Sequence, residues 1–107
     1  MQQFIIYALD HTDADALNRR MAARPAHLER MKNLRDNNNY VLGAAILDEN
    51  EKMIGSNIIL QFETEAVLYD YLKTEPYVLG AVWGNIKINK TRVANLGLWF
   101  LILSITH

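Results

Sequence analysis

Residues 40–62 read YVLGAAILDENEKMIGSNIILQF, in which two apolar runs flank the polar residues ENEK. Runs of strand length around a short polar loop predict a β-hairpin, with strands over 40–48 and 53–62. Both runs are apolar at nearly every position rather than at alternate ones, so we expect both faces of the sheet to be covered. Each face of the sheet therefore needs a cover, from the rest of the chain or from another copy of it.

Helical patterns flank this hairpin on both sides. Before it, between Asp13 and about residue 37, apolar residues recur at helical spacing in two stripes, formed by Leu17 and Met21 and then by Leu28, Met31 and Leu34. We expect a helix there, broken or bent at Pro25. After the hairpin, residues 64–73, TEAVLYDYLK, predict a second helix with Thr64 as its N-cap.

The outermost segments have the character of strands. Residues 3–9, QFIIYAL, are rich in β-branched and aromatic types and end at a polar cluster. Residues 81–90, AVWGNIKINK, alternate, with Val82, Ile86 and Ile88 on one face and Trp83, Asn85 and Lys87 on the other. The order β-α-β-β-α-β predicts an α+β, ferredoxin-like fold, in which two helices cover one face of a four-stranded antiparallel sheet.

The second face of that sheet still needs a cover. Pairing two sheets across a two-fold axis is the simplest one, so we expect a homodimer or a dimer of dimers.

The last residues form a second apolar surface that needs a cover, because 96–105 read LGLWFLILSI. A membrane-spanning helix needs about 20 apolar residues, so this run is too short for one. We divide the chain into a domain, 1–95, and an apolar tail, 96–107, expected to pack in a subunit interface; contact with a membrane surface and a reading-frame artefact are the alternatives.

Composition narrows the classes of function. The 107 residues suffice for one domain, and a formal net charge of -1 gives no general attraction to nucleic acid or to an anionic membrane. No strand shows the aromatic pattern of an RNA-recognition motif, so we expect no nucleic-acid partner. The absence of cysteine excludes disulfides and thiolate chemistry and fits the reducing cytoplasm.

Two charged clusters are better explained without a ligand. Asp10, His11, Asp13 and Asp15 lack the spacing of a calcium loop, and capping of the following helix is the preferred interpretation. The histidines have no zinc-site spacing, so no metal is expected. Basic residues crowd the first helix but alternate with acids, which indicates a solvated face, at Arg19, Arg20, Arg24, Arg30, Lys32 and Arg35.

His27, in RPAHLERM at 24–31, is the candidate for proton transfer. If Pro25 opens a helical segment, His27 lies in the first turn, where the helix dipole favours a neutral imidazole that can act as a general base. If Pro25 only kinks one continuous helix, this reason lapses. The alternative is that His27 packs on an apolar stripe with Met31 and Leu34.

Glu75, in TEPYVLGAVW at 74–83, is the candidate partner. A carboxylate in a short connection could orient the imidazole and stabilise its charged form. The alternative is that Glu75 merely opens a helical turn at Pro76, where a negative charge interacts well with the dipole. The sequence pattern alone does not bring Glu75 to His27.

Several of these segments, in this order, resemble the YCII-related (YciI-like) family. The matching pieces extend to about Leu96: IIYALD at 5–10, RPAHLERM at 24–31, LGAAILDENEKMIGS at 42–56, TEPYVLGAVW at 74–83 and INKTRVANL at 88–96. The resemblance implies a dimeric α+β barrel of ferredoxin-like halves, with a pocket and a His-Asp pair in each subunit. It also implies small-molecule chemistry, since dehydrochlorination of chlorinated hydroquinones is associated with the family.

By position, the resemblance makes His27 and Glu75 the catalytic pair. The family usually has aspartate in a DPYV motif, and glutamate lengthens that side chain by about 1.5 Å. Asp10 also matches the family and could face His27 or Arg24. Ser56 could form a hydrogen-bonding wall, although a hydroxyl beside a bulge at Gly55 is the simpler interpretation. Tyr77, in the same motif as Glu75, is assigned to substrate binding.

Two functions are consistent with these residues. In the first, neutral His27 removes a proton from a small substrate without a cofactor, Glu75 or Asp10 orients it, and Arg24 neutralises oxyanion charge, as in a lyase or dehydrochlorinase. In the second, the same cleft only binds a small ligand, and His27 packs or donates hydrogen bonds. A third possibility is an interaction module that acts through the apolar tail.

Overall fold

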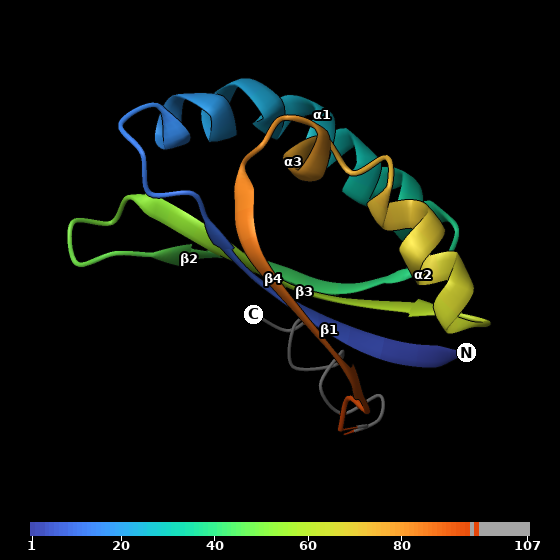
Figure 1. Ribbon diagram of the computed structural model, residues 1–107. Helices are drawn as coiled ribbons and strands as arrows, with labels where there is room; N and C mark the ends of the chain where they lie inside the picture. Colours follow the sequence, from blue (N-terminus) through green and yellow to red (C-terminus); the bar gives the residue numbers. More distant parts are fainter. Residues whose placement is uncertain (95, 97–107) are drawn as a thin grey trace, which may run out of the picture.

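The elements follow the predicted order, with one short helix added (Figure 1). The computed structural model describes residues 1–94 and 96. It contains β1 (Gln2–Asp10), α1 (Ala16–Asp36), β2 (Tyr40–Leu47), β3 (Met53–Phe62), α2 (Glu65–Leu72), α3 (Pro76–Leu79) and β4 (Trp83–Thr91). The predicted tail, 96–107, lies outside the described residues except for Leu96. Within the described part, no helix is long and apolar enough to cross a bilayer.

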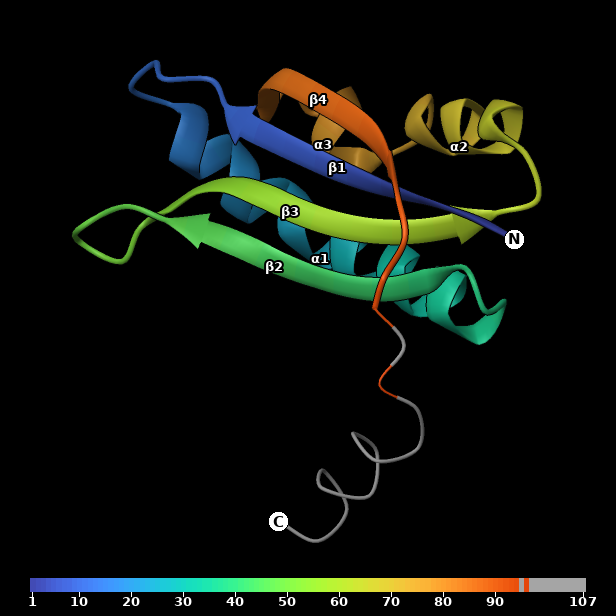
Figure 2. The ribbon, with the colours of Figure 1, turned by 90° about the horizontal axis from the view of Figure 1, so that it is seen from below.

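The four strands form one sheet in the order β2-β3-β1-β4, and each neighbouring pair is antiparallel. All three helices lie on one face of this sheet, and Figure 2 views the molecule from the opposite face. This arrangement confirms the predicted α+β, ferredoxin-like fold. It also brings α3 into contact with α1.

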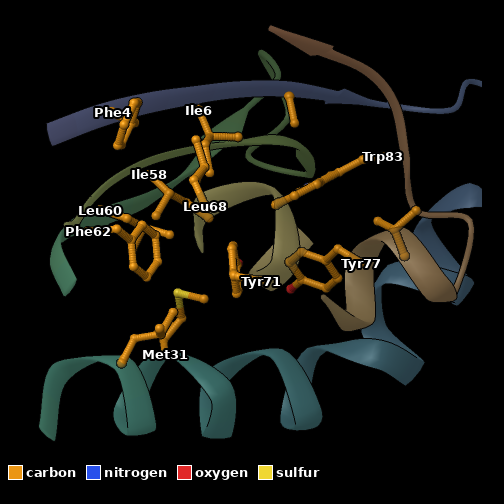
Figure 3. Close-up of a cluster of buried hydrophobic side chains, with 13 residues drawn as sticks. Phe4, Ile6, Met31, Ile58, Leu60, Phe62, Leu68, Tyr71, Tyr77 and Trp83 are labelled. Atoms are coloured by element: carbon orange, nitrogen blue, oxygen red, sulfur yellow. The ribbon is translucent and has the colours of Figure 1, made fainter. Parts of the chain in front are cut away.

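The core lies between the sheet and the helices (Figure 3). Alternate residues of the two central strands point into it, as the two-residue period of a strand requires. From the sheet come Phe4, Ile6, Ala8, Ile58, Leu60 and Phe62. They meet Met31 and Leu34 of α1 and Leu68 and Tyr71 of α2. Burying each large apolar side chain stabilises the fold by about 1.5–3 kcal/mol.

Helix α1 is one continuous helix with Pro25 inside it. The interpretation in which Pro25 opens a separate helical segment is therefore wrong. Pro25 has no N–H to donate to the carbonyl of Met21, and the 21-residue helix tolerates this gap while it arches over the sheet (Figure 1).

The start of α1 also differs from the prediction. The N-cap residue, Asp15, makes no side-chain capping bond. Instead, Asp13 accepts a hydrogen bond from the backbone nitrogen of Asp15 at 3.2 Å and forms an ion pair with Arg19 at 2.8 Å. The acidic cluster thus shapes the turn before the helix without capping it.

A bulge changes the predicted faces of β4. The register shifts between Leu9 and Asp10, so that Leu9 lies opposite Asn85 while Asp10 lies opposite Trp83. The extra residue, Gly84, turns Trp83 to the helix side of the sheet, where its indole is 5 % exposed. The prediction that Trp83 shares a face with Asn85 is therefore wrong. The bulge brings the indole toward α3 (Figure 3).

Candidate functional site

His27 and Glu75 meet in the interior between α1 and α3. Nδ1 of His27 lies 2.6 Å from Oε1 of Glu75. The imidazole is nearly buried and the glutamate is fully buried. The fold therefore accommodates the longer side chain of glutamate, whose carboxylate contacts the imidazole at hydrogen-bond distance.

Three donors converge on the Glu75 carboxylate. Oε1 accepts from the backbone nitrogen of Tyr77 at 3.1 Å in addition to His27, and Oε2 accepts from the hydroxyl of Tyr71. Burial, reinforced by the negative charge of Glu75, raises the pKa of Tyr71, so that its hydroxyl stays protonated as a donor. Glu75 is also the N-cap of α3. These bonds compensate for the removal of the carboxylate from water and fix its orientation.

The contact with Glu75 selects one tautomer of His27. A carboxylate accepts only, so Nδ1 carries the proton that faces it, and Nε2 is left to exchange a proton with a ligand. The dipole argument for a neutral imidazole does not apply, because His27 lies in the interior of α1. The carboxylate, rather than the helix end, is the electrostatic partner of this imidazole.

His27 forms part of the wall of a pocket between α1 and strands β2 and β3. The pocket has a volume of about 170 Å³. One part of its wall is apolar, with Leu28, Met31 and Ile58. The polar part contains Arg20, Arg24, His27, Ser56 and Tyr77. An engineered apolar cavity of about 150 Å³ holds benzene, so this pocket is large enough for one small ring.

Arg20 is the main site residue that sequence reasoning missed. It is 2 % exposed, whereas a solvated face was predicted for it. Its Nη1 donates to both carboxylate oxygens of Asp10 at 2.9 and 3.0 Å, and its Nη2 donates to Oγ of Ser56 at 2.9 Å. The signal was its position seven residues before His27, since residues at i and i+7 share one helix face.

Asp10 and Ser56 belong to this buried network. Asp10 contacts Arg20, so the expectation that it faces His27 or Arg24 is wrong. Burial raises the pKa of Asp10, and the charge of Arg20 offsets only part of that effect. Ser56 accepts a second bond from Nε1 of Trp83 at 3.1 Å. Ser56 therefore links α1 to the sheet at the wall of the pocket.

The ring of Tyr77 joins the two polar groups of the site. It stacks on the imidazole of His27 with centroids 4.0 Å apart and an angle of 14° between the planes. The guanidinium carbon of Arg20 lies 4.6 Å from the same ring centroid. Burial raises the pKa of Tyr77, against the opposing charges of Arg20 and Arg24, and the phenol remains a donor.

The structure brings most of the predicted site residues together. Arg24, His27, Ser56 and Tyr77 line one pocket, and Glu75 lies behind the imidazole. Asp10 instead borders a second, more open hollow of about 570 Å³, beside the β2–β3 hairpin. Among the described residues, no group of three His, Asp or Glu side chains could hold a metal ion.

Comparison with known proteins assigns the chain to a family. A model of the YCII-related domain matches residues 3–91, which include His27 and Glu75. The chain belongs to the YCII-related family. Relatives within this family include Protein YciI of Escherichia coli O6:H1, 30% identical over 91 residues that cover 79% of this chain and 91% of that one. An uncharacterized protein of Haemophilus influenzae is 33% identical over 89 residues, with 78% and 89% covered.

Two solved structures support the YCII-type fold. A 5-chloro-2-hydroxyhydroquinone dehydrochlorinase from Burkholderia phenoliruptrix, in complex with 2,5-dihydroxybenzoquinone, has a TM-score of 0.74 at 18% identity, covering 86% of this chain and 95% of that one. A dimeric ferredoxin-like protein of unknown function from Jannaschia has a TM-score of 0.51 at 15% identity, covering 87% and 100%. At these identities the similarity establishes the fold alone.

Proposed function

We propose that this protein is a small-molecule enzyme of YCII type that uses the His27–Glu75 pair to move a proton. The observation that carries the proposal is the 2.6 Å contact between Nδ1 and Oε1 in the wall of a ring-sized pocket. Catalytic pairs of this kind hold the imidazole with one nitrogen so that the other can act as a general base. Within the described residues, no hydrogen bond engages Nε2, which leaves it available to a substrate.

The proposed reaction is the loss of one proton and one chloride ion from a chlorinated hydroquinone. The reacting form is the keto tautomer of the ring, in which the chlorine-bearing carbon also carries a hydrogen. Nε2 of neutral His27 takes the proton of a remaining ring hydroxyl, the O–H electron pair forms a new C=O bond, the adjacent ring double bond shifts toward the chlorine-bearing carbon, and chloride leaves with the C–Cl electron pair to give a quinone. The buried charge of Glu75 then stabilises the imidazolium, and Arg24 stabilises negative charge on a substrate oxygen. Support for this substrate class comes from the structurally similar dehydrochlorinase, whose substrate is 5-chloro-2-hydroxyhydroquinone.

The test is chloride release from 5-chloro-2-hydroxyhydroquinone by the purified protein. We expect Glu75→Gln to lower kcat by about 100-fold or more, because the imidazolium loses its counter-charge. Glu75→Asp keeps the charge and should retain more activity than Glu75→Gln. Glu29→Gln, which changes an exposed carboxylate of α1, is the control for charge alone. Full activity in His27→Gln would contradict the proposal.

A binding protein without catalysis is the second candidate. The close stacking of His27 on Tyr77 favours it, because this contact also fits an imidazole held for packing and hydrogen bonding. This candidate predicts that 2,5-dihydroxybenzoquinone binds to the wild type while no chloride is released from the chlorinated substrate. A His27→Ala variant that unfolds, instead of staying folded and inactive, would also support it.

We also propose that a second copy of the chain covers the helix-free face of the sheet. Register pairs Ile5 of β1 with Ile59 of β3 on that face, and Tyr7 and Leu42 expose apolar surface nearby. The dimeric state of the Jannaschia protein supports this assembly. Packing of the apolar tail, 96–107, in such an interface and a cytoplasmic location both stay predictions from the sequence.

A further inference from the structure

Among the residues that the structure describes, the wall of the pocket contains two arginines and no acidic residue. Its charged and ionisable lining residues are Arg20, Arg24, His27 and two tyrosines, with no acidic residue among them. Both nearby carboxylates stand behind a partner: Glu75 is fully buried behind His27, and Asp10 lies beyond Arg20 and borders the other hollow. A ligand in the pocket therefore meets Arg20 and the imidazole of His27 before it meets either carboxylate.

Arg24 differs from Arg20 in having no counter-ion. Within residues 1–94 and 96, the ion pairs of α1 involve Arg19, Arg20, His27, Lys32 and Arg35 and leave Arg24 out. Arg24 is half-buried and forms part of the pocket wall. A guanidinium that is partly withdrawn from water without a carboxylate is suited to bind an anion from solution.

The neutral groups of the wall also offer protons. Oγ of Ser56 already accepts hydrogen bonds from Nη2 of Arg20 and from Nε1 of Trp83. Both of its lone pairs are therefore used, and toward a ligand the hydroxyl can only donate. Tyr77 has a raised pKa and thus keeps its phenolic proton. Nε2 of neutral His27 is an acceptor in the same wall. The opposite side of the wall, at Leu28, Met31 and Ile58, suits a flat apolar body.

We propose that the ligand of this pocket is a small organic anion, a ring-sized apolar body that carries a carboxylate or enolate-type oxygen held by Arg24, Ser56 and Tyr77. This inference rests on the proposed function only in sharing its pocket, and it names the charge of the substrate that the function leaves open. An anion held by these residues lies in the same pocket as the imidazole of His27. A neutral ring of the same size leaves the donors of the wall unpaired, which costs affinity.

The test is calorimetric titration with matched ligands. Benzoate and benzamide share shape and ring but differ in charge, and inorganic phosphate supplies charge without an apolar body. The anion of 2,5-dihydroxybenzoquinone and its neutral dimethyl ether form a second pair, which separates an enolate from a carboxylate. We expect one of the two anions to bind at least tenfold more tightly than its neutral counterpart and than phosphate.

Two variants locate the effect at Arg24. Arg24→Gln should remove about tenfold of the anion affinity and leave the neutral ligands unchanged, while Arg24→Lys should keep part of the preference. Arg35→Gln, on the exposed surface of the same helix, is the control for long-range charge. Equal affinities within both ligand pairs, or an anion preference that survives Arg24→Gln, would overturn the inference.

The same titration of His27→Gln separates this inference from the proposed catalysis. Retained anion selectivity together with lost chloride release supports both proposals. Anion selectivity in a wild-type protein that releases no chloride refutes the proton-transfer function and leaves the anion site standing. Chloride release without anion selectivity refutes the anion site alone.

Discussion

Two carboxylates of this chain are withdrawn from water, and each is satisfied in a different way. Glu75 collects three hydrogen bonds from groups on α1, α2 and α3. Asp10 relies on a single cation, the guanidinium of Arg20. A buried ion pair contributes little net stability, but removal of one partner leaves an uncompensated charge. Asp10 is therefore the more vulnerable of the two.

This difference predicts the effect of removing Arg20. Arg20→Met should lower the free energy of unfolding by about 3–5 kcal/mol near pH 7, because the ionised Asp10 is left buried and unpaired. The loss should shrink as the pH falls. Burial raises the pKa of Asp10 above its ordinary value of 3.8. The contribution of Asp10 to the free energy of unfolding is therefore most favourable where the carboxyl is protonated, and it is lost as the pH rises through the raised pKa.

Urea unfolding of Arg20→Met from pH 4 to pH 8 measures this effect. The double variant with Asp10→Asn serves as the control, since it removes the charge and should recover much of the loss at pH 7. A pH-independent loss that the double variant does not reduce would show that Arg20 stabilises by packing on Tyr77 instead.

At the scale of elements, α1 positions the site and carries an unusual residue at its middle. Arg20, Arg24, His27 and Met31 all line the pocket from this one helix, at intervals of three or four residues. Such spacing places them in a row along one face. Pro25 lies between Arg24 and His27 in the sequence but is exposed and does not line the pocket. The row therefore depends on the helix continuing through the proline.

A substitution at Pro25 tests this continuity. Pro25→Ala supplies the missing N–H and removes the clash of the proline ring, which together stabilise a helix interior by about 3 kcal/mol. The substitution also gives the unfolded chain more conformational freedom, which offsets about 1 kcal/mol of that gain. We expect the free energy of unfolding to rise by about 1–2 kcal/mol, measured by urea unfolding, with the chemical shift of His27 unchanged in NMR spectra. A drop in stability would mean that the arch of α1 over the sheet needs the proline.

At the scale of the whole molecule, the two faces of the sheet are unequal. The helix side buries its large side chains almost completely, whereas Tyr7 and Leu42 on the other face are 43 % and 57 % exposed. Isolated exposed apolar residues are ordinary, but a contiguous group on a sheet is typical of an interface. The second copy proposed above would withdraw this group from water.

Charge on that face should prevent association. We expect the wild type to have the mass of a dimer in light scattering and Leu42→Lys to have that of a monomer, since a buried unpaired lysine is costly. Leu79→Lys is the matched control, because Leu79 is 70 % exposed on α3, on the helix side. A monomeric wild type, or a Leu79→Lys variant that dissociates as readily, would contradict the proposed interface.

Local pattern was enough for the sequence to determine the elements and their order. The hairpin at 40–62, the amphipathic segment around Met31 and the apolar run at 3–9 each have the period of one structure, and their order admits the ferredoxin-like sheet. The boundaries moved by a few residues. The bulge at Gly84 escaped prediction because a pattern of alternation cannot show where a ladder gains a residue.

Only the tertiary structure decided which polar residues face one another. The residue patterns indicated His27 and Glu75 separately, and only the family resemblance paired them. Their contact depends on how α3 packs against α1 across 48 positions of chain. The same packing buries Arg20 and gives it Asp10, although an arginine on a charged helix has the pattern of a solvated residue. The periodicity of a sequence shows which side of a helix or strand is apolar. The pairing of charges depends on the distances between elements, and a local pattern does not contain those distances.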